Sequence, residues 1–128
     1  MSPKLRAAFA TAMHAARAHY AREELDAAFA QLERAHILGQ RYTLAHVRSH
    51  WWMLRVGWRR SDAQEGWGQI ARIVAALLFS RLWVPVGNTG GANVNPLRPM
   101  PVPADLQRLL DADRRERNRR PRFWASLG

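Results

Sequence analysis

The chain has 128 residues, 48% of them hydrophobic, and a formal net charge of +10 that comes almost entirely from arginine. This length is typical of a single domain, and the six tryptophans supply ample surface for a packed core, which excludes global disorder. The absence of cysteine excludes disulfides, thiolate metal sites and thiol nucleophiles, and it agrees with the cytoplasmic location that we expect.

Two helices are predicted in the first third of the chain. Ser2 followed by Pro3 is a typical helix start, and apolar residues at three- and four-residue spacing extend this helix to about Tyr20. A second helix is predicted from about Glu23 to Leu38, with Gly39 as the residue that follows its end.

Two further helices follow. Thr43 is placed to cap a third helix that ends near Trp58, and a capping-box pattern at residues 61–65 opens a fourth helix to about Leu82. Short turns between four helices imply antiparallel neighbours, so we predict an all-α fold of two helix hairpins. The helical spacing of the tryptophans in these segments predicts that three are in the core (Trp51, Trp58, Trp67) and that Trp52 is exposed.

Membrane insertion is not expected. The longest apolar run, residues 73–79, is flanked closely by arginines and is much shorter than the roughly 20 residues of a transmembrane helix.

Glycine, asparagine and proline dominate residues 83–103, which are therefore predicted to form an ordered strap. Within it, the Gly87, Asn88, Thr89, Gly90, Gly91 loop has two interpretations: an anion nest of backbone N–H groups, or a structural turn that the Asn88 amide pins onto the helices. The loop lacks the Gly-Lys-Ser/Thr ending of a phosphate loop, so we favour the structural turn.

A short helix is predicted from Pro103 to about Arg117. We expect residues 1–110, including the strap, to form one helical domain. Residues 111–128 contain six arginines and three acids, and we expect them to form the basic end of the last helix and a solvated tail.

Small residues in the first two helices (Ala16, Ala28, Ala35) resemble the close-packing positions of a tetratricopeptide-type helix hairpin. A true repeat would return about 34 residues later. The nearest equivalent of Ala28 is Gly68, forty residues on, so any repeat is degenerate. We therefore predict a pair of stacked hairpins and not a regular tetratricopeptide repeat.

Four stretches resemble a bacterial family known as domain of unknown function 3703: residues 32–40 (LERAHILGQ), residues 46–54 with His46 and the His50-Trp-Trp-Met-Leu run, residues 84–91 (VPVGNTGG) and residues 99–106 (PMPVPADL). The resemblance spans most of the chain up to about residue 110 and implies no established activity. It does imply an association with heavy-metal resistance and efflux genes. The arginine-rich tail lies outside it.

Four metal-ligating side chains flank the turn between the second and third helices. In an antiparallel hairpin centred near Arg41, His36 and His46 lie at one level, and Glu33 and His50 at the next. Helices that pack 8–10 Å apart bring such groups within reach of one ion. Imidazoles with one carboxylate suit zinc, copper, nickel or iron, and sharing an ion requires ring nitrogens closer than about 8 Å.

Two functions therefore remain open. The first is a metal-associated accessory protein that binds a divalent transition-metal ion through Glu33, His36, His46 and His50. The second is a helical interaction module in which these histidines are structural and the basic surface binds an acidic protein or nucleic acid. Paired carboxylates are scarce and the serines have no nearby His–Asp arrangement, so an enzyme is the less favoured interpretation; acid–base chemistry by His46 or His50 is the route that stays open to it.

Overall fold

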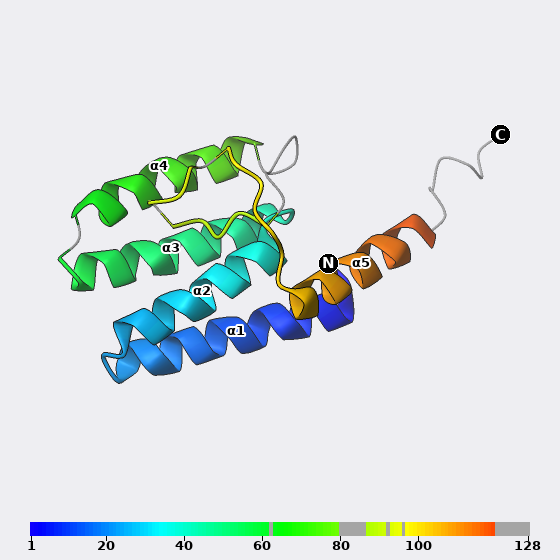
Figure 1. Cartoon of the computed structure of the whole chain (residues 1–128), viewed down its shortest axis with the longest axis horizontal. Helices are drawn as coiled ribbons and strands as arrows, with labels where there is room; N and C mark the ends of the chain where they lie inside the picture. Colours follow the sequence, from blue (N-terminus) through cyan, green and yellow to red (C-terminus); the bar gives the residue numbers. More distant parts are fainter. Residues whose placement is uncertain (62, 80–86, 92, 96, 120–128) are drawn as a thin grey trace.

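The computed structural model describes residues 1–61, 63–79, 87–91, 93–95 and 97–119. These residues contain five helices and no strand (Figure 1): α1 (Pro3–Ala21), α2 (Leu25–Gly39), α3 (Thr43–Arg59), α4 (Ala63–Phe79) and α5 (Ala104–Arg119). The protein is therefore all-α, as predicted.

The first four helices form a row in which each is antiparallel to the next (Figure 1). The most extensive contacts are those between α1 and α2 and between α3 and α4, and α2 packs against α3 to join the two hairpins. The α5 helix packs across one end of α1 and α2. None of the described helices is long and apolar enough to cross a membrane.

Only some of the helix ends lie where the sequence predicted them. The Ser2 hydroxyl accepts a hydrogen bond from the Leu5 N–H and caps α1, as predicted. Glu23 lies in the turn before α2 with a φ of 63°, and not in the helix. Thr43 is the first residue of α3, which has no side-chain cap, and the capping-box residue Asp62 lies outside the described residues.

Alanines allow the close approach of the first two helices. Ala16, Ala28 and Ala35 are at most 1% exposed, and a larger side chain at any of them would separate the helices that pack there. The rest of the buried apolar core comes from α1, α2, α3 and the start of α5: Leu5, Phe9, Ala12, Met13, Leu32, Ile37, Leu38, Met53, Val56 and Leu106.

The tryptophan prediction was wrong. Trp51, Trp58 and Trp67 are 53%, 80% and 73% exposed, whereas Trp52 is half-buried and packs edge-on against Tyr20 of α1. Both long faces of α3 carry large apolar residues, so helical spacing alone did not reveal which face packs inward. The buried face proves to be the one that carries His46, His50 and Met53.

Asp113 connects α5 to the body of the protein. Its carboxylate accepts hydrogen bonds from the Ser2 N–H at 2.6 Å and from the Tyr42 hydroxyl at 2.5 Å. Burial opposes the ionisation of Asp113, but the bonds from Tyr42 and Ser2 outweigh it and hold the pKa of this carboxyl below its usual value. Residues beyond 110 thus contribute to the folded body.

Gly39 is the last residue of α2 and not the residue after it. A Cβ atom at this position would lie 2.9 Å from Phe9 Cε2 and 3.0 Å from Ala45 Cβ, so the glycine allows three segments to meet. We expect Gly39→Ala to lower the free energy of unfolding by about 1–3 kcal/mol, although glycine-to-alanine changes normally stabilise a helix. Urea unfolding measures the change, and a stabilised variant would contradict the close contact.

Candidate metal centre

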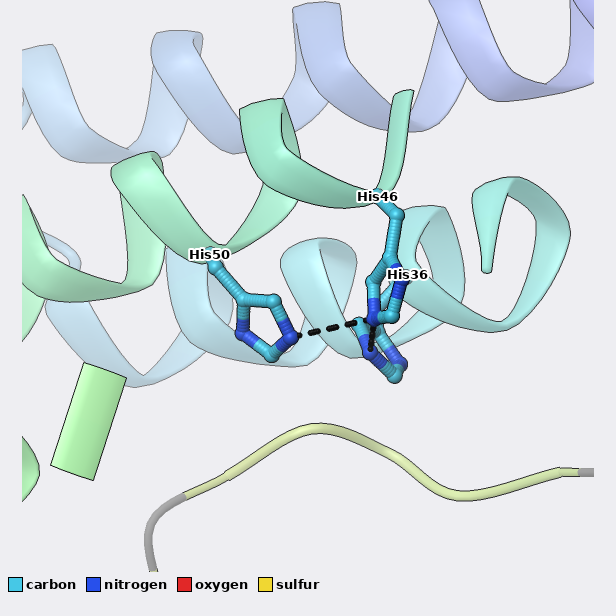
Figure 2. Close-up of side chains that lie close together, drawn as sticks. All are labelled: His36, His46 and His50. Carbon is cyan, nitrogen blue, oxygen red and sulfur yellow. Dashed lines mark hydrogen bonds between the residues drawn. The ribbon is translucent and has the colours of Figure 1, made fainter. Parts of the chain in front are cut away.

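Three histidines meet where α2 ends and α3 begins (Figure 2). His36 lies in the last turn of α2, and His46 and His50 occupy successive turns of α3. The short turn between the helices brings both ends to one place, so the i, i+4 pair on α3 faces the single histidine of α2. All three side chains are buried, with exposures of 3%, 7% and 2% in chain order.

The ring nitrogens converge on His46. Its Nε2 atom lies 2.8 Å from Nε2 of His36 and 3.1 Å from Nε2 of His50. One nitrogen from each ring lies within 4.8 Å of the others, well inside the distance that sharing one ion requires. Tetrahedral zinc with bonds of 2.0–2.1 Å places neighbouring nitrogens about 3.3 Å apart. The two spacings at His46 are 0.2–0.5 Å shorter than this value, and the full set lies within 4.8 Å, so small side-chain movements would bring the three nitrogens around one ion.

The proton on His36 can be located from its partner. Nδ1 of this ring lies 2.8 Å from the backbone carbonyl oxygen of Asn88, which can only accept a hydrogen bond. Nδ1 therefore carries the proton, and Nε2 of the neutral ring has a free lone pair that points toward His46.

The same reasoning applies to His50 through Gln69 of α4. The amide nitrogen of Gln69 donates to the carbonyl oxygen of Gly90 at 2.9 Å, so the other amide atom, Oε1, is an acceptor. His50 Nδ1 lies 2.6 Å from this oxygen and must donate to it. The Nε2 atom of His50 is then also unprotonated.

Two lone pairs thus point at one nitrogen. Nε2 of His46 can carry at most one proton, which both neighbours would have to share. A cation in its place would meet three imidazole nitrogens once His46 carries its proton on Nδ1. Hydrogen bonds from Nδ1 to a carbonyl or carboxamide oxygen, as made by His36 and His50, are the usual outer support of metal-bound histidines.

Burial keeps the three rings neutral. It is the main cause that lowers the pKa of His36 well below its usual range, that of His46 to about 4 and that of His50 to about 3. The neighbouring rings and the charge of Arg72 lower the pKa values of His36 and His50 further. The hydrogen bonds that these rings donate to Asn88 and Gln69 act in the opposite direction and raise them. Near neutral pH, protons therefore do not compete for the converging nitrogens.

Residues 87–91 of the strap run along one side of the histidine cluster (Figure 2). Gly90 has a φ of +86° and lies so close to His36 that a Cβ atom would be 2.8 Å from its Cδ2 atom. The Asn88 side chain donates to the carbonyls of Asn95 and Arg98 and accepts from the Gly90 N–H. The loop is therefore held by its own hydrogen bonds. The Thr89 hydroxyl between these two residues is buried without a hydrogen-bond partner.

The α4 helix holds the strap from the other side through Gln69 and Arg72. Arg72 donates to the carbonyl of Val94, and Gln69 is fully buried between His50 and Gly90. Sequence reasoning missed both residues. The available signal was their polarity, since they are the polar side chains in the otherwise apolar segment of residues 67–79.

Glu33 is the fourth residue that the sequence suggested. It is half-buried on α2, one turn before His36, and it does not belong to the cluster of converging atoms. The structure thus brings together three of the four candidates.

These features define a small all-helical domain with a buried three-histidine cluster under a Gly/Asn strap. Residues 3–110 match the family described as protein of unknown function (DUF3703), so the chain belongs to that family, as its sequence motifs indicated. The match contains the whole cluster and the strap. Comparisons with curated proteins and with solved structures gave no match.

The buried histidines predict an acid-sensitive fold. Because their folded pKa values are below the ordinary value near 6.5, the unfolded chain binds more protons, and stability is complete above pH 6.5 and falls as the pH is lowered toward 4. Each ring contributes up to about 1.4 kcal/mol per pH unit. Urea unfolding of metal-free protein between pH 7.5 and 5 measures the slope. It should shrink in His46→Ala but persist in His14→Ala, and a flat profile would contradict burial of neutral rings.

The close contact of the strap with His36 predicts a specific effect of Gly90. Gly90→Ala places Cβ against the imidazole and forces a side chain into a left-handed backbone, so we expect a loss of about 1–3 kcal/mol. The matched variant is Gly91→Ala, whose Cβ would first meet the movable Asn93 side chain. Thermal or urea unfolding compares the two, and equal effects would show that the strap does not rest on the ring.

Proposed function

We propose that the protein binds one divalent transition-metal ion through the Nε2 atoms of His36, His46 and His50, and that it acts in the cytoplasm as a metal-associated accessory protein. The observation that carries this proposal is the convergence of two unprotonated nitrogens on a third. Heavy-metal resistance, which the family resemblance implies, is the cellular role that fits such an activity.

A purely structural role explains the cluster less well. Structural histidines in a core satisfy their ring nitrogens with carbonyls or hydroxyls, as His36 and His50 do through Nδ1. Their Nε2 atoms instead both approach one atom, Nε2 of His46, which can donate at most one proton. Leaving a polar network only partly satisfied in a core is less stable than an apolar packing of the same volume. A cation resolves this shortage, because it takes lone pairs and needs no proton.

The donor set favours some metals over others. Neutral imidazoles suit zinc, copper and nickel, whereas iron(II) sites of this type usually include a carboxylate, so iron is the least expected. Three protein ligands leave a coordination position open, as in catalytic or exchanging zinc sites, while structural sites are closed by four. Solvent or Glu33 would complete the coordination.

The test is metal binding by the full chain without a His tag. We expect one equivalent of zinc, copper or nickel in a competition titration, and a loss of affinity of at least about 100-fold in His46→Ala. His14→Ala is the matched control, because it removes an exposed histidine of α1, and far-UV circular dichroism checks folding. Glu33→Gln reports the fourth ligand: a further weakening identifies Glu33, and an unchanged affinity identifies solvent.

Absence of stoichiometric binding, or equal affinity in His46→Ala, would refute the metal proposal. It would favour the second function, an interaction module for nucleic acid or an acidic protein. One observation supports that alternative: Trp51 and Trp58 are exposed on a face of α3 that also exposes Arg48 and Arg55, and aromatic and basic side chains together suit single-stranded nucleic acid. Strongly salt-dependent oligonucleotide binding would identify it.

A further inference from the structure

The row of four helices has two ends, and their outer surfaces differ. At one end, the exposed residues of α1 are small or polar: Pro3, Lys4, Arg6, Ala7, Ala10, Thr11, His14 and Ala21. At the other end, all exposed residues of α4 that the structure describes are apolar: Trp67, Ile70, Ala71, Val74, Ala75, Leu77 and Leu78. A helical array needs a polar outer face at a free end, and only the α1 end has one.

The apolar residues of α4 form one continuous stripe. Trp67, Ile70, Val74 and Leu77 follow the three–four–three spacing of a helix that packs along a second helix. Their exposures are 73%, 41%, 53% and 56%. The opposite face of α4 already packs on α3 and carries Gln69 toward His50 and the strap. The stripe is therefore exposed although the opposite face of α4 already packs on α3.

In the part of α4 that the structure describes, the exposed surface differs from that of the other helices in its lack of charged residues. The exposed face of α3 mixes Leu44, Trp51 and Trp58 with Arg48 and Arg55. Among the described residues, α4 is the one helix whose exposed positions carry no charge. Two molecules that each carry a net charge of +10 repel one another, so an association between them is least opposed along this charge-free face.

We infer that a second copy of the chain covers this stripe through an antiparallel contact between the two α4 helices. The polar α1 end offers no match for head-to-tail stacking, which leaves the self-complementary arrangement about a two-fold axis. In that arrangement, Trp67 of one copy faces Leu77 of the other, and Ile70 faces Val74, with Ala71 close to the axis. The antiparallel alternation of the row then continues across the contact.

The area of the stripe determines how stable the proposed dimer should be. The four large side chains of the stripe and the adjacent Leu78 offer on the order of 300 Å² per copy, less than the roughly 800 Å² of a standard interface. We therefore expect a weak dimer that dissociates in the micromolar range.

Sedimentation equilibrium of the full chain with a chelator present tests this inference apart from the metal site. The wild type should show a monomer–dimer equilibrium, and Val74→Glu, which places a charge in the middle of the stripe, should be monomeric up to about 100 µM. Leu44→Glu is the matched control, since it adds the same charge at an exposed leucine of α3 and should still dimerise. A monomeric wild type, a dimeric Val74→Glu or a monomeric Leu44→Glu would overturn the inference.

Cysteine cross-linking gives a second test that does not depend on how Val74→Glu folds. The natural chain has no cysteine, so single introduced thiols report one contact each. Ala71→Cys, near the axis, should form a disulfide-linked dimer on mild oxidation, whereas Leu78→Cys, far from its own copy, should not. Cross-linking at both positions would indicate parallel helices and overturn the antiparallel arrangement. Failure at Ala71 would overturn the contact.

Discussion

Three neutral imidazoles are buried at one point, where two acceptor nitrogens approach Nε2 of His46 and this atom can carry at most one proton. His36 and His50 direct their protons outward to oxygen atoms of Asn88 and Gln69, and both must therefore turn an unprotonated nitrogen inward. Three contacts of the surrounding segments meet this requirement. The strap supplies one of the outer oxygens, α4 supplies the other, and Gly90 lets the strap lie directly on the His36 ring.

The α4 helix has two faces with different contacts. Its inner face supports the histidines and the strap through Gln69 and Arg72. Its outer face is a continuous apolar stripe that nothing in the described structure covers. One helix thus carries both the Gln69 contact to His50 and the outer stripe. The position of His50 Nε2 and the proposed contact between copies therefore depend on the same element.

The sequence predicted more of the site than of its surroundings. Equal distance from a tight helix–helix turn is a local relation, and it correctly brought His36, His46 and His50 together. Glu33 met the same spacing rule but lies outside the cluster, because a helix position fixes a level and not a direction toward the centre. Gln69 and Asn88 were not recognised as partners of the rings, since these contacts join segments separated by 19 and 52 residues.

By itself, the sequence determined the all-α class, the five helical segments and the turn that gathers the histidines. These properties depend on apolar periodicity, glycine and proline positions and short connections, all of which act over a few residues. Only the tertiary structure decided which face of α3 is buried, and therefore why Trp51 and Trp58 are exposed while Trp52 is half-buried. It also decided where each histidine carries its proton, because the oxygen that accepts that proton comes from a distant part of the chain.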